Sequence, residues 1–298
     1  MIRKVPDVLR QVIFIATALV LYFGVRGLTE GHVQDALDNA DRLLRLEQRT
    51  GLAWEDAFQN PVSQWWLLRD AVNWIYIWGH WPVIAVTAVT LYRRHRPAYL
   101  LLRDAFFVSG AIGLVIFAMF PVAPPRLTDM GLVDTVTRHS NAYRVLQPPG
   151  FINHYAAMPS LHAGWNLLVG LTLFQVSRNR TVKILAGLSP LLMAYAVVAT
   201  ANHFVIDAFA GMALSMAGYF AAIGVATLRG RRGGYHDDPP PSTTRRLRSP
   251  QLVAGGRTLV LRRGLEWPWL HGPFPIMLLG VGPRRRKRAS APTSLNNP

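Results

Sequence analysis

Three short stretches of this sequence carry polar side chains beside long apolar runs. FPVAPPRL contains Arg126, MPSLHAG contains Ser160 and His162, and ANHFVIDAFAG contains His203 and Asp207. Imidazole, carboxylate, guanidinium and hydroxyl groups are the side chains that move protons and bind anions in enzyme sites. These three stretches therefore contain the candidate catalytic and anion-binding residues.

Each stretch also has a structural interpretation. His203 and Asp207 are four residues apart and share a helix face, where a carboxylate fixes the imidazole tautomer and raises its basicity; a structural ion pair closing a helical hairpin is the alternative. Pro-Ser before His162 is an ordinary helix start, yet the N–H groups of such a turn bind anions. Arg126 offers a fork for phosphate, or serves as an interfacial anchor.

Together these groups provide the components of phosphoryl transfer. One oriented imidazole can act as nucleophile and a second as general acid, while a guanidinium and a helix N-terminus hold the phosphate oxygens. A zinc site formed by His162, His203 and Asp207 is the competing use. We favour the anion site, because Arg126 beside a metal cation would be unfavourable. We therefore expect neither a metal nor a cofactor.

The composition predicts membrane-spanning elements that position these groups. Hydrophobic residues make up 51% and charged residues 16% of the chain, whereas soluble domains average about 25% charged residues. The N-terminal run is followed by Arg26 rather than a small-residue cleavage site, so we interpret it as a retained helix. We expect an all-α bundle of six transmembrane helices, formed by the uncharged runs 11–25, 71–92, 105–121, 163–177, 184–202 and 208–228.

Basic residues predict how this bundle is oriented. They cluster at the N-terminus, between runs two and three, between runs four and five, and after Arg229. With six spans, all four clusters fall on one side, which the positive-inside rule makes cytoplasmic. We therefore expect a multi-pass protein of the cell membrane with both termini cytoplasmic. The three polar stretches then meet at the extracytoplasmic face, although they were not used to derive the orientation.

The chain divides into four predicted segments. We expect a first transmembrane helix (1–30), an extracytoplasmic amphipathic segment (31–70), a five-helix catalytic core (71–228) and a basic, disordered cytoplasmic tail (229–298). Within the second segment, Val33, Leu37, Ala40 and Leu44 recur at helical spacing and suggest a helix on the membrane surface. The tail carries a net charge of +11, but its Gly and Pro content argues against a folded nucleic-acid-binding module.

The motifs resemble a known family. PSLH followed by HFVID is similar to the type 2 phosphatidic acid phosphatase, or lipid phosphate phosphatase, superfamily, whose members are six-helix membrane enzymes related to vanadium haloperoxidases. APPR, MPSLHAG and NHFVIDAFAG most resemble its inositolphosphotransferase branch, which includes inositol phosphorylceramide synthase. With RLEQRTGLAWED, the similar layout extends over about 30–228.

The resemblance implies a role for each candidate residue. His203 would attack phosphorus and form a phosphohistidine, Asp207 would orient it, and His162 would protonate the leaving group. Arg126 and Ser160 would bind the phosphoryl oxygens. The sequence also departs from the superfamily pattern in three ways. The first motif lacks a lysine, Leu161 replaces a glycine, and Ala196-Val197 replaces a Ser-Arg pair; Arg138, Arg144 and His154 are candidate substitutes for the missing arginine.

We therefore predict a membrane enzyme that transfers or hydrolyses a phosphoryl group on a lipid phosphate. Its expected partners are that lipid and the bilayer, and not nucleic acid. The rival hypothesis is a non-enzymatic transporter or scaffold that uses the polar cluster as a binding site. The sequence leaves open the lipid, the acceptor (water or an alcohol) and the oligomeric state.

Overall fold

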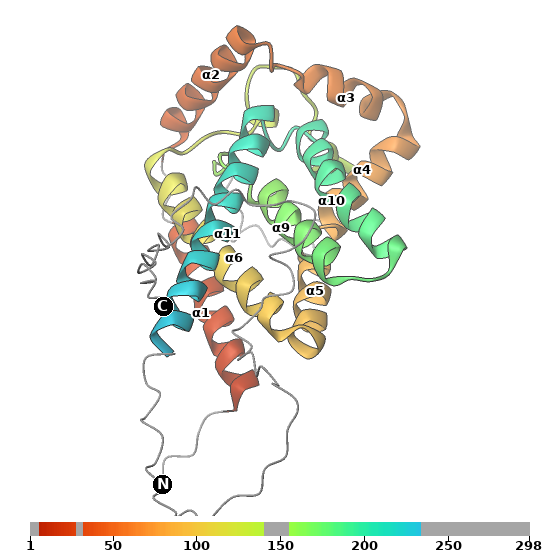
Figure 1. The fold of residues 1–298 in the computed structure, drawn as a ribbon. Helices are drawn as coiled ribbons and strands as arrows, with labels where there is room; N and C mark the ends of the chain where they lie inside the picture. The colour runs from red at the N-terminus through yellow and green to blue at the C-terminus, as the bar shows by residue number, and fades with distance from the viewer. Residues whose placement is uncertain (1–5, 28–31, 140–154, 234–298) are drawn as a thin grey trace, which may run out of the picture. The chain divides into compact units, whose positions relative to one another are not determined.

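The fold was examined in a computed structural model that describes residues 6–27, 32–139 and 155–233 (Figure 1). Within these ranges the chain is helical apart from its connections and one isolated parallel bridge between Val122 and Ala156. The predicted all-α class is thus confirmed for the described part of the chain. The elements are α1 (Asp7–Gly27), α2 (Val33–Thr50), α3 (Glu55–Gln64), α4 (Trp66–Trp78), α5 (Trp81–Arg94), α6 (Arg96–Met119), η1 (Pro125–Leu127), α7 (Thr135–His139), α9 (Leu161–Val176), α10 (Arg180–Ala199) and α11 (Val205–Gly233).

Local sequence signals explain several helix ends. The side chain of Asn179 caps α10 by accepting hydrogen bonds from the N–H groups of Thr181 and Val182. Helices α5 and α6 each have a proline in the first turn, where no intrahelical donor is lost. Helix α2 ends at Gly51, whose φ of 73° lies in the left-handed region that glycine adopts without strain.

The helices that follow residue 155 pack closely around α9. Helix α9 contacts α10 and α11, and α11 also packs along α6. Close approach requires glycine at the contact points: a Cβ on Gly170 would overlap the carbonyl oxygen of Ala186 in α10, and one on Gly211 would overlap that of Ser160. These contacts place the beginnings of α9 and α11, which follow the second and third polar stretches, beside each other.

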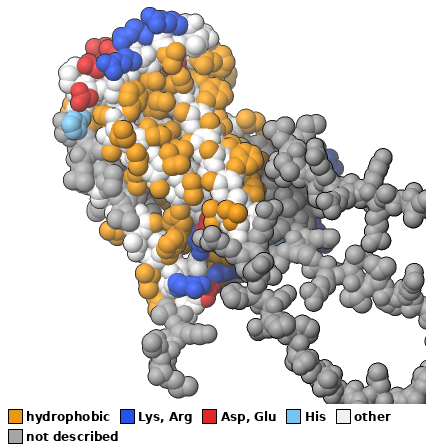
Figure 2. All heavy atoms as spheres, turned by 60° about the vertical axis from the view of Figure 1, so that its left-hand side comes forward, with side chains coloured by type: hydrophobic (Ala, Val, Ile, Leu, Met, Phe, Trp, Pro, Cys, Tyr) orange, Lys and Arg blue, Asp and Glu red, His pale blue; other side chains and the backbone are white. Residues whose placement is uncertain are grey.

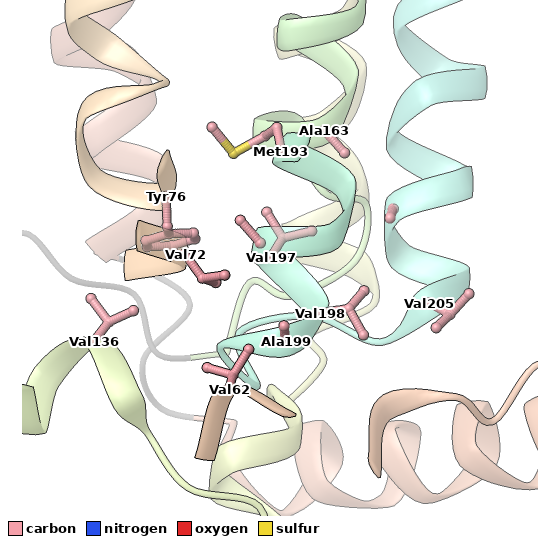
Figure 3. Packing of buried hydrophobic residues seen from close by; sticks show 12 residues of the cluster. Val62, Val72, Tyr76, Val136, Ala163, Met193, Val197, Val198, Ala199 and Val205 are labelled. Atoms are coloured by element: carbon pink, nitrogen blue, oxygen red, sulfur yellow. The ribbon is translucent and has the colours of Figure 1, made fainter. Parts of the chain in front are cut away.

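A core of buried side chains lies next to these helix ends (Figure 3). Val197 and Met193 of α10 pack in it with Tyr76 of α4 and Ala163 of α9, and α3, α7 and α11 contribute further members. Val197, where the motif resemblance led us to expect an arginine, is fully buried. The apolar residue therefore contributes to packing.

The amphipathic helix predicted within 31–70 forms, and most of its predicted apolar face packs on the protein. Of the four predicted residues, Ala40 is buried, Leu37 and Leu44 are half-buried and Val33 is exposed. The first three pack on a second core cluster that contains Val122, Ala123 and Phe204. The buried stripe also includes two polar residues, Asn39 and Glu47, which apolar spacing alone does not predict. A location of this helix at the membrane surface stays a prediction.

Apolar helices make the chain compatible with an integral membrane protein. Three helices are long and apolar enough to cross a membrane, and the pair α4–α5, bent by 45° at a short break, gives a fourth. Helix α9 is apolar but shorter, and α1 covers the first predicted run. Figure 2 shows apolar side chains covering one face between two ends where Lys and Arg gather. The predicted count of six spans is not confirmed and stays a prediction.

Several predictions fall on residues that the structure does not describe. Most of the basic tail predicted for 229–298 is among them, as are Arg144 and His154. Arg138 belongs to the short helix α7. The boundaries of the four predicted segments are likewise untested.

Candidate active site

His203 lies in the turn between α10 and α11 and is almost fully buried. Its Nδ1 is 2.7 Å from the backbone carbonyl oxygen of Ala157 and 3.6 Å from Oδ2 of Asp207. A carbonyl oxygen can only accept a hydrogen bond, so Nδ1 must carry the proton. In the neutral ring Nε2 then has the free lone pair. Asp207 lies beside the ring, although His203 precedes α11 rather than sharing a helix face with it, and Ala157 is the closer partner of Nδ1.

Carboxylates from three helices surround the start of α11. Each of them accepts a hydrogen bond from one of three consecutive backbone N–H groups, which a helix start leaves without intrahelical partners. Negative charge is also favourable at this end of the helix dipole. The pairs are Phe204 N with Asp207 at 2.9 Å, Val205 N with Glu55 at 2.9 Å and Ile206 N with Glu47 at 2.7 Å.

The side chains of Glu47 and Glu55 are fully buried. Their exposed fractions are 0% and 1%, and Oε2 of Glu47 has no hydrogen-bond partner among the described residues. Burial, chiefly, and the neighbouring carboxylates of Glu55 and Asp207 raise the pKa of Glu47 to about 9, against the lowering effect of the Ile206 N–H. Glu47 is therefore protonated at neutral pH, which limits the negative charge gathered at this helix start.

Arg126 is attached to the same turn as His203. Its backbone N–H donates to the carbonyl of Ala201, and its Nη1 donates to Oδ1 of Asn202 at 2.5 Å. Its Nε is 3.3 Å from Oδ2 of Asp134. The guanidinium is thus oriented by residues on both sides while remaining partly exposed. A partly exposed, oriented guanidinium is suited to bind an anion next to His203.

Ser160 and His162 begin α9, as the sequence predicts. The Ser160 hydroxyl oxygen accepts a hydrogen bond from Ala163 N, and its own N–H donates to the carbonyl of Asp207 at 2.9 Å. The residue is fully buried. These contacts make Ser160 a helix cap that ties α9 to α11, while its predicted role in binding phosphate stays a prediction.

His162 is enclosed by aromatic rings. Its ring centroid is 6.1 Å from that of His203, 5.0 Å from that of Tyr76, which stacks on it at 15°, and 4.1 Å from that of His80. The two histidines predicted to share the chemistry therefore do lie together, and a third accompanies them.

The zinc alternative receives no support from the side chains that the structure places. No group of three or more His, Asp, Glu or Cys residues in the described ranges is arranged to hold a metal ion. Instead, the arrangement combines an imidazole with a free lone pair, a second imidazole and an oriented guanidinium. These groups are suited to attack on phosphorus with proton transfer to the leaving oxygen.

Comparison with known proteins agrees with this geometry. A family model described as the PAP2 superfamily matches residues 41–221. The chain belongs to the PAP2 superfamily. All five candidate residues lie within the match, and members of the superfamily are phosphatases and phosphotransferases. No curated protein and no solved structure matches the chain. The resemblance seen in the motifs is therefore confirmed at the level of the PAP2 superfamily, and the inositolphosphotransferase branch is not.

The candidate site of this PAP2 superfamily member also contains residues that were not predicted as site residues from the sequence. The Ala157 carbonyl has no side-chain signal and could not have been found. Glu47 and Glu55 lie within RLEQRTGLAWED, a stretch that resembles the family in layout, and two acidic residues flanking a helix-ending glycine were the available signal. His80 was visible as a histidine inside an apolar run, and Asn166 as a polar residue one turn after His162.

Proposed function

We propose that this protein is an integral membrane phosphotransferase or phosphatase that acts on a lipid phosphate through a phosphohistidine at His203. The observation that carries the proposal is the short contact between His203 Nδ1 and the Ala157 carbonyl. Because the proton is held on Nδ1, the Nε2 lone pair is available to attack phosphorus. A nucleophile oriented before substrate binds needs no rearrangement during the reaction.

The first half-reaction breaks the ester bond of the lipid phosphate. His203 Nε2 forms an N–P bond while the bond between phosphorus and the leaving oxygen breaks, and that oxygen takes a proton from His162. Arg126 stabilises the negative charge on the phosphoryl oxygens. Asp207, 3.6 Å from Nδ1, stabilises the positive charge that the ring of His203 acquires.

The second half-reaction restores the enzyme. His162, now neutral, takes a proton from the acceptor hydroxyl, whose oxygen attacks phosphorus as the N–P bond breaks. With water the product is free phosphate, and with an alcohol it is a new phosphate ester. The motif resemblance favours an alcohol acceptor, as in the inositolphosphotransferases, and this branch assignment is part of the proposal.

The proposal also includes how the protein sits in a membrane. Besides the four candidate spans, α1 and α9 complete a set of six, matching the six uncharged runs. Arg93, Arg94 and Arg96 then lie on the cytoplasmic side with both termini. The candidate active site faces the extracytoplasmic side of the cell membrane, where the head group of a lipid in the outer leaflet is accessible.

A trapping experiment tests the chemistry. Purified protein in liposomes is mixed briefly with lipid labelled in its phosphate group and quenched in alkali, which preserves phosphohistidine. We expect label on a peptide that contains His203, and none in a His203→Ala variant with an unchanged thermal unfolding midpoint. A folded His203→Ala variant with full turnover would disprove the mechanism.

Product analysis of the same reaction separates the two acceptors. Reactions run with and without inositol are compared for labelled free phosphate and labelled inositol phosphate. Release of free phosphate alone establishes a phosphatase and rejects the transferase. A newly labelled inositol-containing product establishes the transferase.

A further inference from the structure

His80 occupies an unusual position for a buried polar residue. It lies at the break between α4 and α5, where the bent pair turns by 45°. The break is packed tightly, because a Cβ on Gly79 would overlap the carbonyl of Ile75 and press on Met193. The exposed fraction of His80 is only 2%. An ionisable residue inside an apolar span is costly to bury, so it requires an explanation by function.

The hydrogen bonds of Asn166 determine the state of His80. Nδ2 of Asn166 is 3.1 Å from the carbonyl oxygen of His162 and 3.2 Å from Nδ1 of His80. A carbonyl only accepts, so the atom facing it must be the amide NH₂ group, which has two hydrogens to donate. The second hydrogen is directed to His80 Nδ1, which is therefore the acceptor. Neutral His80 then carries its proton on Nε2.

This arrangement connects His80 to His162 in two ways. Through Asn166, it is linked to the backbone of His162 by two consecutive hydrogen bonds. Directly, its ring lies against the His162 ring, with centroids 4.1 Å apart and planes inclined by 33°. The rings of Trp81 and Trp165 also lie against His80, with their centroids 5.0 Å and 6.0 Å from that of the His80 ring. His80 is thus held firmly against one residue of the site.

We propose that His80 is a positioning residue that, with Asn166, holds the His162 imidazole where it protonates the leaving oxygen. The inference rests on the proposed function, since it takes His162 to be the general acid. In that step the P–O bond breaks, the electron pair stays on the leaving oxygen, and a proton moves to it from His162. A displacement of the ring by 1 Å would weaken this transfer without affecting attack by His203.

A series of substrates with different leaving groups tests this role. A nitrophenyl phosphate releases an anion that is stable without protonation, whereas an alkyl phosphate needs a proton as its bond breaks. The value of kcat/KM, which reports on the steps up to cleavage of the ester, is measured for both substrates in the wild type, His162→Ala and His80→Phe. Phenylalanine preserves a ring against His162 and removes the nitrogen atoms.

We expect both variants to discriminate between the substrates. His162→Ala should lower kcat/KM by about 100- to 10,000-fold for the alkyl phosphate, and His80→Phe by about 10- to 100-fold, with much smaller losses for the nitrophenyl phosphate. The double variant should be no slower than His162→Ala alone, because residues that act through one another are not additive. Equal losses for the two substrates, or additive losses in the double variant, would overturn the proposal.

Asn73 provides a matched control for burial of a polar group in α4. It is 4% exposed and exchanges two hydrogen bonds of 2.9 Å with Thr135. Asn73→Ala should lower the yield of folded protein and leave the ratio between the two substrates unchanged. If His80→Phe does not fold, Asn166→Ala decides the question, since the proposal requires the same dependence on the leaving group.

The outcome is separable from failure of the proposed function. If the wild type never carries label on His203, the phosphohistidine mechanism fails whatever His80 does. If His203 is labelled normally and His80→Phe slows both substrates equally, only the positioning role is rejected.

Discussion

Gly164 of α9 and Gly211 of α11 face each other where the two histidine motifs cross. A Cβ on Gly164 would overlap the carbonyl oxygen of Gly211, and one on Gly211 would overlap that of Ser160. Gly164 is the last residue of the motif MPSLHAG, and Gly211 is the last residue of the motif NHFVIDAFAG. They allow the backbone contact between Ser160 and Asp207, which places His162 beside His203.

Substitution of Gly211 should therefore damage both folding and activity. Gly211→Ala must push α9 away from α11, which we expect to cost about 1–3 kcal/mol and to lower the thermal unfolding midpoint in detergent. Gly224→Ala, in the same helix with nothing within 4 Å of the added carbon, is the control. It should be neutral or stabilising by up to ~1 kcal/mol. Equal midpoints for the two variants would contradict this account of the crossing.

Asp207→Asn should retain more activity than the same change in sites where a carboxylate alone fixes the histidine tautomer. There, the asparagine variant loses about 10⁴-fold because the tautomer is wrong. Here the Ala157 carbonyl holds the proton on Nδ1, and an asparagine oxygen can still accept from Phe204 N. We expect kcat to fall by less than about 100-fold, since mainly charge stabilisation is lost.

The measurement compares kcat for Asp207→Asn and Asp207→Ala on the same lipid phosphate. The alanine variant also loses the cap on Phe204 and should be less stable and slower. A loss near 10⁴-fold in a folded Asp207→Asn variant would mean that the carbonyl of Ala157 does not fix the tautomer.

Glu47 should make the protein less stable as the pH rises. Burial raises its pKa from 4.5 to about 9, so between these values the folded state binds a proton that the unfolded state has released. The stability contributed by this group is therefore complete below about pH 4.5 and declines until the pH passes about 9. Titrations of other groups add to this trend, so a variant is needed to isolate it.

Glu47→Gln isolates the contribution, because glutamine can still accept from the N–H of Ile206 but does not titrate. We expect its unfolding midpoint to decline less than that of the wild type between pH 5 and 9. Glu47→Ala, which leaves that N–H without its acceptor, should be destabilised throughout the range. Parallel pH curves for wild type and Glu47→Gln would show that Glu47 is ionised in the folded protein.

The proposed orientation can be tested with single cysteines, because the chain contains none. Asp129 follows Arg126 by three residues and Arg94 is the last residue of α5, and both residues are exposed. In intact cells, a membrane-impermeant maleimide should label Asp129→Cys and should reach Arg94→Cys only after permeabilisation. Labelling of both positions from the same side would reject the proposed topology.

Features that depend on apolar burial could be predicted from the sequence, whereas features that depend on hydrogen bonds to distant backbone groups could not. Apolar runs predicted the helices, and the five candidate residues come to one region because each lies at or next to the end of a helix. Most of the predicted apolar face of α2 packs on the protein, but its buried polar members, Asn39 and Glu47, were not predicted, because they are buried by hydrogen bonds to distant backbone groups. The role of the Ala157 carbonyl could not be predicted, because every residue has a backbone carbonyl and only the folded conformation places this one beside His203.

The carboxylate cap of α11 has a consequence for how the protein assembles. Glu47 and Ile206 are 159 residues apart in the chain, and Glu55 and Val205 are 150 apart. Helix α11, which carries Asp207, is synthesised after α2 and α3, and its first turn is completed by side chains from these earlier helices. Contacts of such long sequence separation slow folding. The hydrogen bonds around this helix start can therefore form in a nascent chain only once α11 has been synthesised.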